Sequence, residues 1–97
     1  MIQRIVLIKL EDAFATPEHR AEVAAHTRAV FPTIPQVKAV TVGTPADQKA
    51  VDSWDLTICV QMDSVDAYHQ YAVHPIHRAY VDDYLKPKLA CLKAWNF

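Results

Sequence analysis

The residues best suited to chemistry in this sequence lie in one short segment, YAVHPIHRAY, at positions 71–80. Tyr71, His74 and His77 are grouped there around Pro75 in an otherwise apolar, helix-like region. An imidazole with an ordinary pKa of about 6.5 can act as a base near neutral pH, whereas a phenol with a pKa of about 10 stays protonated and can donate a hydrogen bond. Tyr71 and His77 are therefore the candidate catalytic residues, for a reaction that removes an acidic proton next to a carbonyl and stabilises the developing oxyanion.

Pro75 interrupts the helix that this segment would otherwise form. Proline disfavours the α conformation for the residue before it, so we expect a break at Val73 or His74 and a new start at Pro75. The break would turn Tyr71 and His77 towards one cavity between the helix and a sheet. His77 lies in the first turn of the second piece, where the helix dipole disfavours imidazolium, so we expect it to be neutral. A purely structural interpretation is also open, with Tyr71 half-buried in a helix and His77 bound to a backbone carbonyl.

Two further residues are candidates for ligand binding. Arg4, like Lys9, could offer a positive charge to an anionic ligand, although charges at strand ends are also typical of a solvated surface. His74 could contact a ligand, but a residue before a helix-starting proline more often caps the turn. The remaining histidines are expected to face solvent and are assigned no role: His19, His26 and His69.

The same segment does not predict a metal site. His74 and His77 are three residues apart, and Asp82 or Asp83 could add a carboxylate. A clear third ligand is missing, and the HExxH pattern of zinc enzymes is absent. We therefore expect no metal and no cofactor.

Hydrophobic periodicity indicates four strands and two helical regions. The clearest signal is WDLTICVQM, residues 54–62, where Trp54 and its alternates face one way while Asp55 and its alternates face the other. Gly43 ends a strand where a turn or bulge with positive φ is expected, and residues 44–53 are expected to form a mobile loop. The expected strands are residues 2–10, 37–43, 54–62 and 89–97, and the expected helical regions are residues 17–31 and 65–85.

The order of these elements, βαββαβ within one domain of residues 1–97, is that of a ferredoxin-like α+β fold. Both crossovers place their helices on one face of the sheet, and the first strand lies between the third and the fourth. The first and last strands are apolar on both sides, so we expect a homodimer that packs sheet on sheet. The same strand order keeps Cys59 and Cys91 about two strand spacings apart, so both should be free thiols.

Composition narrows the partners. The chain has 10 basic and 11 acidic residues, a formal charge of -1, which gives no electrostatic reason to expect binding to nucleic acid or to a membrane surface. Met1 leads into an apolar run at residues 5–8 that is too short for a signal peptide or a membrane span. We expect a cytoplasmic protein whose partners are small molecules or other protein chains.

Four parts of the sequence together resemble the stress-responsive dimeric α+β barrel family, often shortened to Dabb: IVLIKL, a central V-G strand end, WDLTICVQM and DAYHQYAVHPIHRAYV. The most specific element is the Y-x-x-H-P-x-H pattern of Tyr71, His74, Pro75 and His77. The resemblance implies a ferredoxin-like protomer paired into a dimeric barrel, often without an established activity. One plant branch, of the olivetolic acid cyclase type, closes a linear polyketide by C2 to C7 aldol condensation. Tyr71 and His77 match its catalytic tyrosine and histidine, whereas Arg4 stands where that branch has a histidine.

Two classes of function are consistent with these residues. In the first, the protein binds or transforms a small, carbonyl-containing organic ligand, as a cyclase-like lyase with His77 and Tyr71 as its acid–base pair. In the second, it is a non-catalytic, stress-responsive structural or interaction protein, and the same residues only stabilise the helix break. A cavity of about 300 Å³ or more beside His77 would favour the first class, and a filled core would favour the second.

Overall fold

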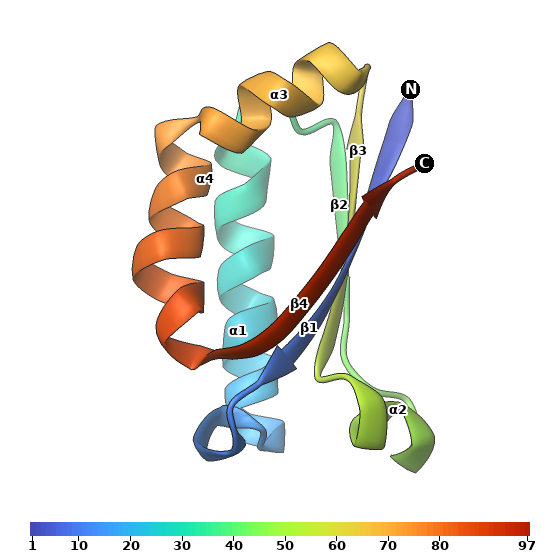
Figure 1. Cartoon of the computed structure of the whole chain (residues 1–97), viewed down its shortest axis with the longest axis vertical. Coiled ribbons are helices and arrows are strands. Elements are labelled where there is room, and N and C mark those ends of the chain that lie inside the picture. Colours follow the sequence, from blue (N-terminus) through green and yellow to red (C-terminus); the bar gives the residue numbers. More distant parts are fainter.

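The computed structural model describes all 97 residues, as a four-stranded antiparallel sheet with most of its helices packed on one face (Figure 1). The strands are β1 (Ile2–Leu10), β2 (Ala39–Gly43), β3 (Leu56–Met62) and β4 (Leu89–Asn96). The helices are α1 (Pro17–Val30), α2 (Gln48–Ser53), α3 (Val65–Val73) and α4 (Pro75–Ala79), and α4 continues as a π-helical segment, Tyr80–Leu85.

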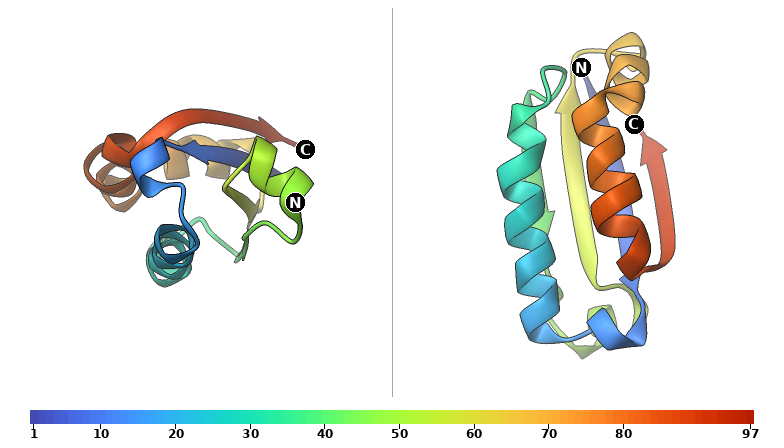
Figure 2. Two further views of the ribbon diagram at one scale, coloured as in Figure 1. Left: turned by 90° about the horizontal axis from the view of Figure 1, so that it is seen from below. Right: turned by 90° about the vertical axis from the view of Figure 1, so that its left-hand side faces the viewer.

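The strand order is β2-β3-β1-β4, so β1 lies between β3 and β4 as predicted. All three pairings are antiparallel. Figure 2 shows α1 and α4 side by side over one face of the sheet, with α3 across its end. The prediction of a ferredoxin-like α+β fold is confirmed.

Short polar side chains fix where the helices begin. Thr16, Asp47 and Ser64 precede α1, α2 and α3, and each side-chain oxygen accepts a hydrogen bond from the backbone N–H three residues later. The Asp47 cap starts α2 inside residues 44–53, so the prediction of a loop throughout that segment is wrong. A helix of six residues carries too little periodicity to be recognised, and its cap is the only local signal.

Gly43 differs from its prediction as well. It does not have a positive φ. It pairs with Thr57 across β2 and β3, and a Cβ at position 43 would lie 2.7 Å from the Thr57 Cγ2. The glycine is therefore needed for the close approach of its neighbour, not for a left-handed turn.

The start of β3 also departs from simple alternation. The strand begins at Leu56, two positions later than predicted, and Asp55, just before it, is completely buried. The Asp55 carboxylate accepts hydrogen bonds from the Leu10 backbone N–H at 2.7 Å and from the Arg20 Nε at 2.9 Å. This buried ion pair ties the ends of β1 and β3 to α1.

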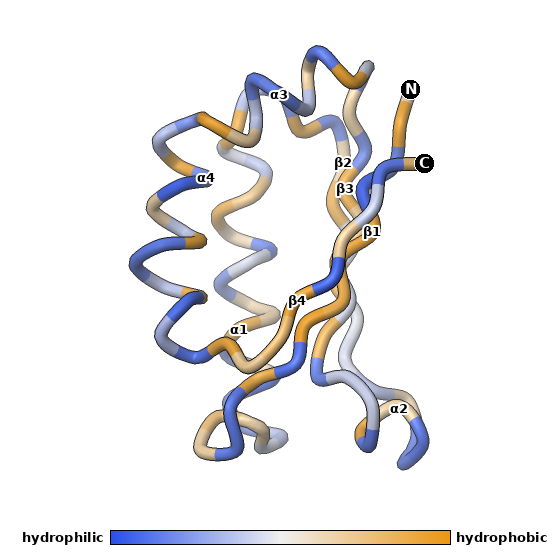
Figure 3. The backbone as a smooth tube through the Cα atoms, viewed as in Figure 1, coloured by the Kyte–Doolittle hydropathy of each residue, from blue (hydrophilic) through white to orange (hydrophobic).

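The core lies between the sheet and the helices. Alternate residues of β1 and β3 point into it, among them Val6, Ile8, Ile58 and Val60. Figure 3 shows hydrophobic residues (orange) concentrated along these two strands, while hydrophilic residues (blue) recur on the outer side of α4. None of the helices is long and apolar enough to cross a membrane.

The opposite face of the sheet is only partly covered. Ile5 and Leu7 lie on it, and Ile5 pairs with Trp95, which is 47% exposed. Polar residues share this face, so it is less uniformly apolar than the sequence suggested; they include Gln3, Lys9 and Gln61. The two cysteines are free, as predicted, on strands that β1 separates.

Candidate functional site

The helix breaks where the sequence predicts. α3 ends at Val73, and α4 begins at Pro75. His74 between them is extended, and its Nδ1 accepts a hydrogen bond from the Ile76 backbone N–H at 3.1 Å. The capping interpretation of His74 is confirmed, because this bond satisfies a donor in the first turn of α4.

A cavity of about 210 Å³ lies between the sheet and the α3–α4 break. It is smaller than the lower limit of about 300 Å³ for drug-sized ligand pockets, but larger than an apolar cavity of about 150 Å³ that holds benzene. Its size therefore suits a ligand of about one substituted ring. The apolar part of the wall includes Val6, Ile8, Phe31, Ile58, Leu85 and Leu92.

Tyr71 projects from α3 into this wall and is only 2% exposed. Burial raises the pKa of its phenol well above the ordinary value, because the charged form would lose its hydration, while the positive charge of Arg4 lowers the pKa slightly in return. Its hydroxyl makes no hydrogen bond within the chain. The group is therefore a protonated donor that is free to meet a ligand.

His77 lies beside Tyr71, with the two ring centroids 4.2 Å apart. Its Nδ1 is 3.1 Å from the Ala72 carbonyl oxygen, and since a carbonyl can only accept, Nδ1 carries the hydrogen. Nε2 then holds the free lone pair of the neutral ring. The structural interpretation from the sequence therefore holds for His77, which binds a backbone carbonyl, while its second ring nitrogen makes no hydrogen bond within the chain.

The pKa of His77 is lowered from its ordinary value, in the predicted direction. Burial is the main cause, and the nearby Arg78 and Arg4 charges add to it, while the hydrogen bond to Ala72 opposes them. The helix dipole invoked from the sequence is not the main reason, since α4 is only five residues long. His77 is consequently neutral at neutral pH.

Arg4 reaches the same cavity from β1, pairing with Val60 and Asn96 on the helix-facing side of the sheet. Its guanidinium carbon lies 4.6 Å from the centroid of the Tyr68 ring, a cation–π distance. Its Nη1 donates to the Asn96 Oδ1 at 3.1 Å. Arg4, Tyr71 and His77 are thus brought together from a strand and two helices.

Other residues from the sequence analysis lie elsewhere. His74 does not line the cavity, and the Lys9 Nζ is 4.0 Å from the buried Asp55 carboxylate. No three His, Cys, Asp or Glu residues are gathered so that they could hold a metal ion.

The expectation that three histidines face solvent holds only for His69. His19 is half-buried, with its Nδ1 2.9 Å from the Thr16 hydroxyl. His26 stacks on Tyr84 with ring centroids 3.9 Å apart. These two rings pack against other side chains because their helix surfaces are covered, which the sequence pattern did not indicate.

Sequence reasoning missed Tyr68 and Phe31 as parts of the site. Tyr68 stands one turn before Tyr71 on α3, so an i, i+3 pair of tyrosines was a usable signal. Phe31 comes from the end of α1, and its ring centroid is 6.4 Å from that of His77. Only the tertiary fold brings it there.

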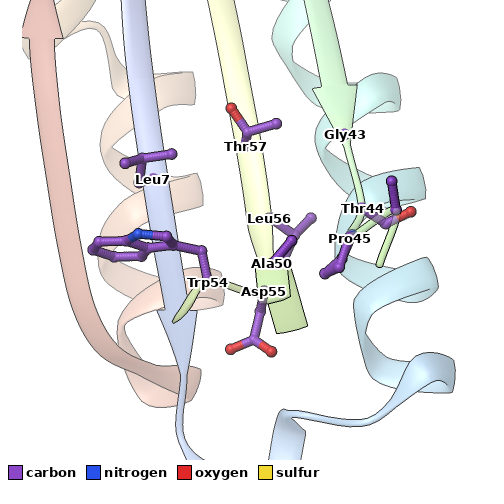
Figure 4. Close-up of a pocket in the computed structure, with 10 residues that line it drawn as sticks. Leu7, Gly43, Thr44, Pro45, Ala50, Trp54, Asp55, Leu56 and Thr57 are labelled. Atoms are coloured by element: carbon purple, nitrogen blue, oxygen red, sulfur yellow. The ribbon is translucent and has the colours of Figure 1, made fainter. Parts of the chain in front are cut away.

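A second cavity, of about 200 Å³, lies on the other face of the sheet (Figure 4). Leu7, Trp54 and Thr57 line it, beside the loop that leads into α2. Its only ionisable residue is Asp55, whose carboxylate is bound to Arg20 and to the Leu10 N–H. This cavity has space but no free acid or base.

Comparison with known proteins points to one family. The family model described as Stress responsive A/B Barrel Domain, Dabb, matches residues 2–94. No curated protein matches the sequence significantly.

Solved structures share the fold over nearly the whole chain. A dimeric ferredoxin-like protein of unknown function from Thermobifida fusca is 27% identical, with a TM-score of 0.81 over 99% of this chain and 88% of that one. A Dabb family protein from Mesorhizobium loti is 19% identical, with a TM-score of 0.81 over 99% and 93% of the two chains. The hydroxynitrile lyase of Passiflora edulis is 13% identical, with a TM-score of 0.79 over 99% and 90%.

Proposed function

The chain belongs to the stress responsive A/B barrel domain family, and from its site we propose that it binds a small carbonyl-containing molecule and catalyses proton transfer on it. One observation carries the proposal. The Tyr71 hydroxyl, without a partner in the chain, and His77, with its Nε2 lone pair free, line the same partly enclosed cavity. A donor and a base at one apolar site are what enolate chemistry requires.

In the proposed reaction, the His77 Nε2 takes a proton from the carbon next to the ligand's carbonyl. The electrons of the broken C–H bond move onto the carbonyl oxygen, where the Tyr71 hydroxyl donates a hydrogen bond to the developing enolate. The Ala72 carbonyl accepts from Nδ1–H and stabilises the imidazolium that forms. Burial keeps both groups in the required protonation states, a neutral imidazole and a neutral phenol.

The likeness to the olivetolic acid cyclase branch suggests an aldol closure as the next step. The enolate carbon attacks a second carbonyl of the same molecule, a C–C bond forms, and the resulting alkoxide takes the proton back from His77. We propose this lyase-like class of reaction on a smaller molecule than a long polyketide, because the cavity has a volume of only about 210 Å³. The fold accommodates lyase chemistry elsewhere, since the hydroxynitrile lyase of Passiflora edulis shares it.

Deuterium exchange at C2 of benzoylacetone, a one-ring β-diketone, tests the proposal by proton NMR. We expect the native protein to accelerate exchange above the buffer rate, and His77→Ala and Tyr71→Phe each to reduce that acceleration at least about tenfold. His69→Ala, an exposed histidine on α3, is the matched control and should exchange at the native rate.

The alternative function is a non-catalytic, stress-responsive structural or interaction protein. It is supported by the small volume of the cavity and by the aromatic packing around His77, where the Phe31 and Tyr71 rings approach closely. Exchange at the buffer rate in the presence of native protein would contradict catalysis and favour this alternative.

We also propose that the protein is a homodimer joined through the open face of the sheet. Ile5, Leu7 and Trp95 lie on that face, and related structures are described as dimeric. Sedimentation at micromolar concentration should give about twice the chain mass of 11.0 kDa. Trp95→Glu should shift the protein to monomer, whereas Val65→Glu, on exposed helix surface, should not; a native monomer would contradict the proposal.

A further inference from the structure

The wall of the cavity beside His77 carries two arginines and no carboxylate. Arg78 is compensated, since its Nη2 lies 2.6 Å from the Asp82 carboxylate. Arg4 forms no ion pair, and its one hydrogen bond goes to the neutral amide of Asn96. The charge of Arg4 is therefore the uncompensated one in the cavity wall.

The environment of Arg4 makes that charge significant. The residue is half-buried, and Tyr68 lies under its guanidinium at 4.6 Å. A charge removed from part of its water is costly unless it meets an opposite charge. A guanidinium has five N–H donors, and only one of them is used within the chain. Its remaining donors suit the two oxygens of a carboxylate, which a guanidinium binds in a bidentate manner.

The positive field of Arg4 also reaches the two catalytic candidates. It lowers the pKa of Tyr71 and that of His77. Because all three side chains line the same cavity of about 210 Å³, a negative group bound at Arg4 would share that space with Tyr71 and His77. The carbon next to such a group would be in the region that the base and the donor share.

The size of the cavity limits the rest of the ligand. The cavity has a volume of about 210 Å³, moderately larger than the roughly 150 Å³ of a cavity that binds benzene. The difference leaves space for a few substituent atoms on one ring, and the apolar walls favour an aromatic or compact aliphatic body.

We propose that Arg4 makes the cavity selective for organic anions, so that its substrates are one-ring carboxylates with a carbonyl or an acidic C–H near the carboxylate. This inference rests on the proposed function for the reaction, but its binding claim stands on Arg4 alone. The carboxylate binds the guanidinium, the ring occupies the apolar space, and the reacting carbon lies between His77 and Tyr71. Arg4 is thus the residue that determines specificity in this site.

Benzoate and its neutral isostere benzamide test the inference by NMR titration of the native protein. We expect benzoate to bind at least about tenfold more tightly than benzamide and to shift the amide resonances of Tyr71 and His77. Its affinity should fall as salt is added. Arg4→Gln should remove the preference for benzoate and leave benzamide binding within about twofold. Arg4→Lys keeps the positive charge but loses the planar guanidinium. Its preference for benzoate should lie between those of the native protein and Arg4→Gln.

Arg78→Gln is the matched control, because this arginine is already paired with Asp82. It should weaken benzoate binding less than about threefold. If Arg4→Gln does not fold, the ratio of the benzoate and benzamide affinities of the native protein tests the inference by itself. Equal affinities, no binding of either probe, or an unchanged preference in folded Arg4→Gln would overturn the inference. The exchange assay uses the neutral diketone, so catalysis of that exchange would leave the proposed function standing after any of these results.

Discussion

Replacing Asp55 with alanine is expected to cost more stability than any other single change in an acidic residue of this chain. Asp55 is fully buried, and its two oxygens accept from the Leu10 backbone N–H at 2.7 Å and from the Arg20 Nε at 2.9 Å. Asp55→Ala removes both acceptors at once. It leaves the Leu10 N–H without this partner and the Arg20 guanidinium without a carboxylate, although the Arg20 side chain is only 12% exposed.

The magnitude can be worked out from these contacts. Removing one partner of a buried ion pair costs about 3–5 kcal/mol, because the other charge stays buried without compensation. A domain of this size has an unfolding free energy of about 5–15 kcal/mol. Asp55→Ala should therefore remove at least about a fifth of the stability, and about 40% at the middle of both ranges.

Urea unfolding followed by circular dichroism measures this loss as a lower midpoint with an unchanged slope. Asp52→Ala is the control, since this exposed carboxylate accepts only from the Gln48 Nε2, at 2.8 Å, and its loss should change stability by less than about 0.5 kcal/mol. Asp55→Asn keeps the shape of the side chain without its charge, so its urea midpoint should fall between those of Asp55→Ala and Asp52→Ala. Equal midpoints for Asp55→Ala and Asp52→Ala would refute the reasoning.

Three further changes have defined outcomes. His74→Ala should cost about 0.5–2 kcal/mol in thermal unfolding through loss of the α4 cap, with His69→Ala as a neutral control; unchanged stability would contradict the capping role. The pKa of His77 lies below the ordinary 6.5 because of burial, so the unfolded chain binds the proton more readily and stability should fall as pH drops below about 6.5. In His77→Gln this part of the pH dependence should flatten, and stability that rises on acidification would be the opposite of what we expect. Gly43→Ala should destabilise by about 1–3 kcal/mol through the contact with Thr57, and Thr57→Ser should restore most of the loss; no rescue would exclude that contact as the cause.

Most of the fold was predictable because its signals are local and repeated. The alternation in residues 56–62 indicates a strand with one buried face, and Pro75 indicates the helix break, which the structure places after Val73. The order of elements then leaves few topologies, and one of them has β1 in the centre.

The parts that were wrong depend on single contacts. Asp55 occupies an alternating position where an acid normally faces solvent, and only the fold brings Arg20 to it. Gly43 was given a turn conformation because the Thr57 methyl that excludes a larger residue lies on another strand.

The sequence predicted the kind of candidate site, a tyrosine and a histidine at a helix break, but not all the residues that form it. Tyr71 and His77 are close in sequence, so their meeting across the break could be expected. The position of Arg4 over Tyr68 could not be expected, because the two residues are 64 positions apart in the chain. The burial that lowers the pKa of His77 is likewise a property of the assembled core.

A crystal structure of the protein with benzoylacetone tests the central claim most directly. We expect ligand density in the cavity beside His77, with a carbonyl oxygen within about 2.6–3.2 Å of the Tyr71 hydroxyl and C2 facing the His77 Nε2. Density confined to the second cavity, beside Trp54 and Leu7, or a ligand whose carbonyl points away from Tyr71, would contradict the proposed catalysis.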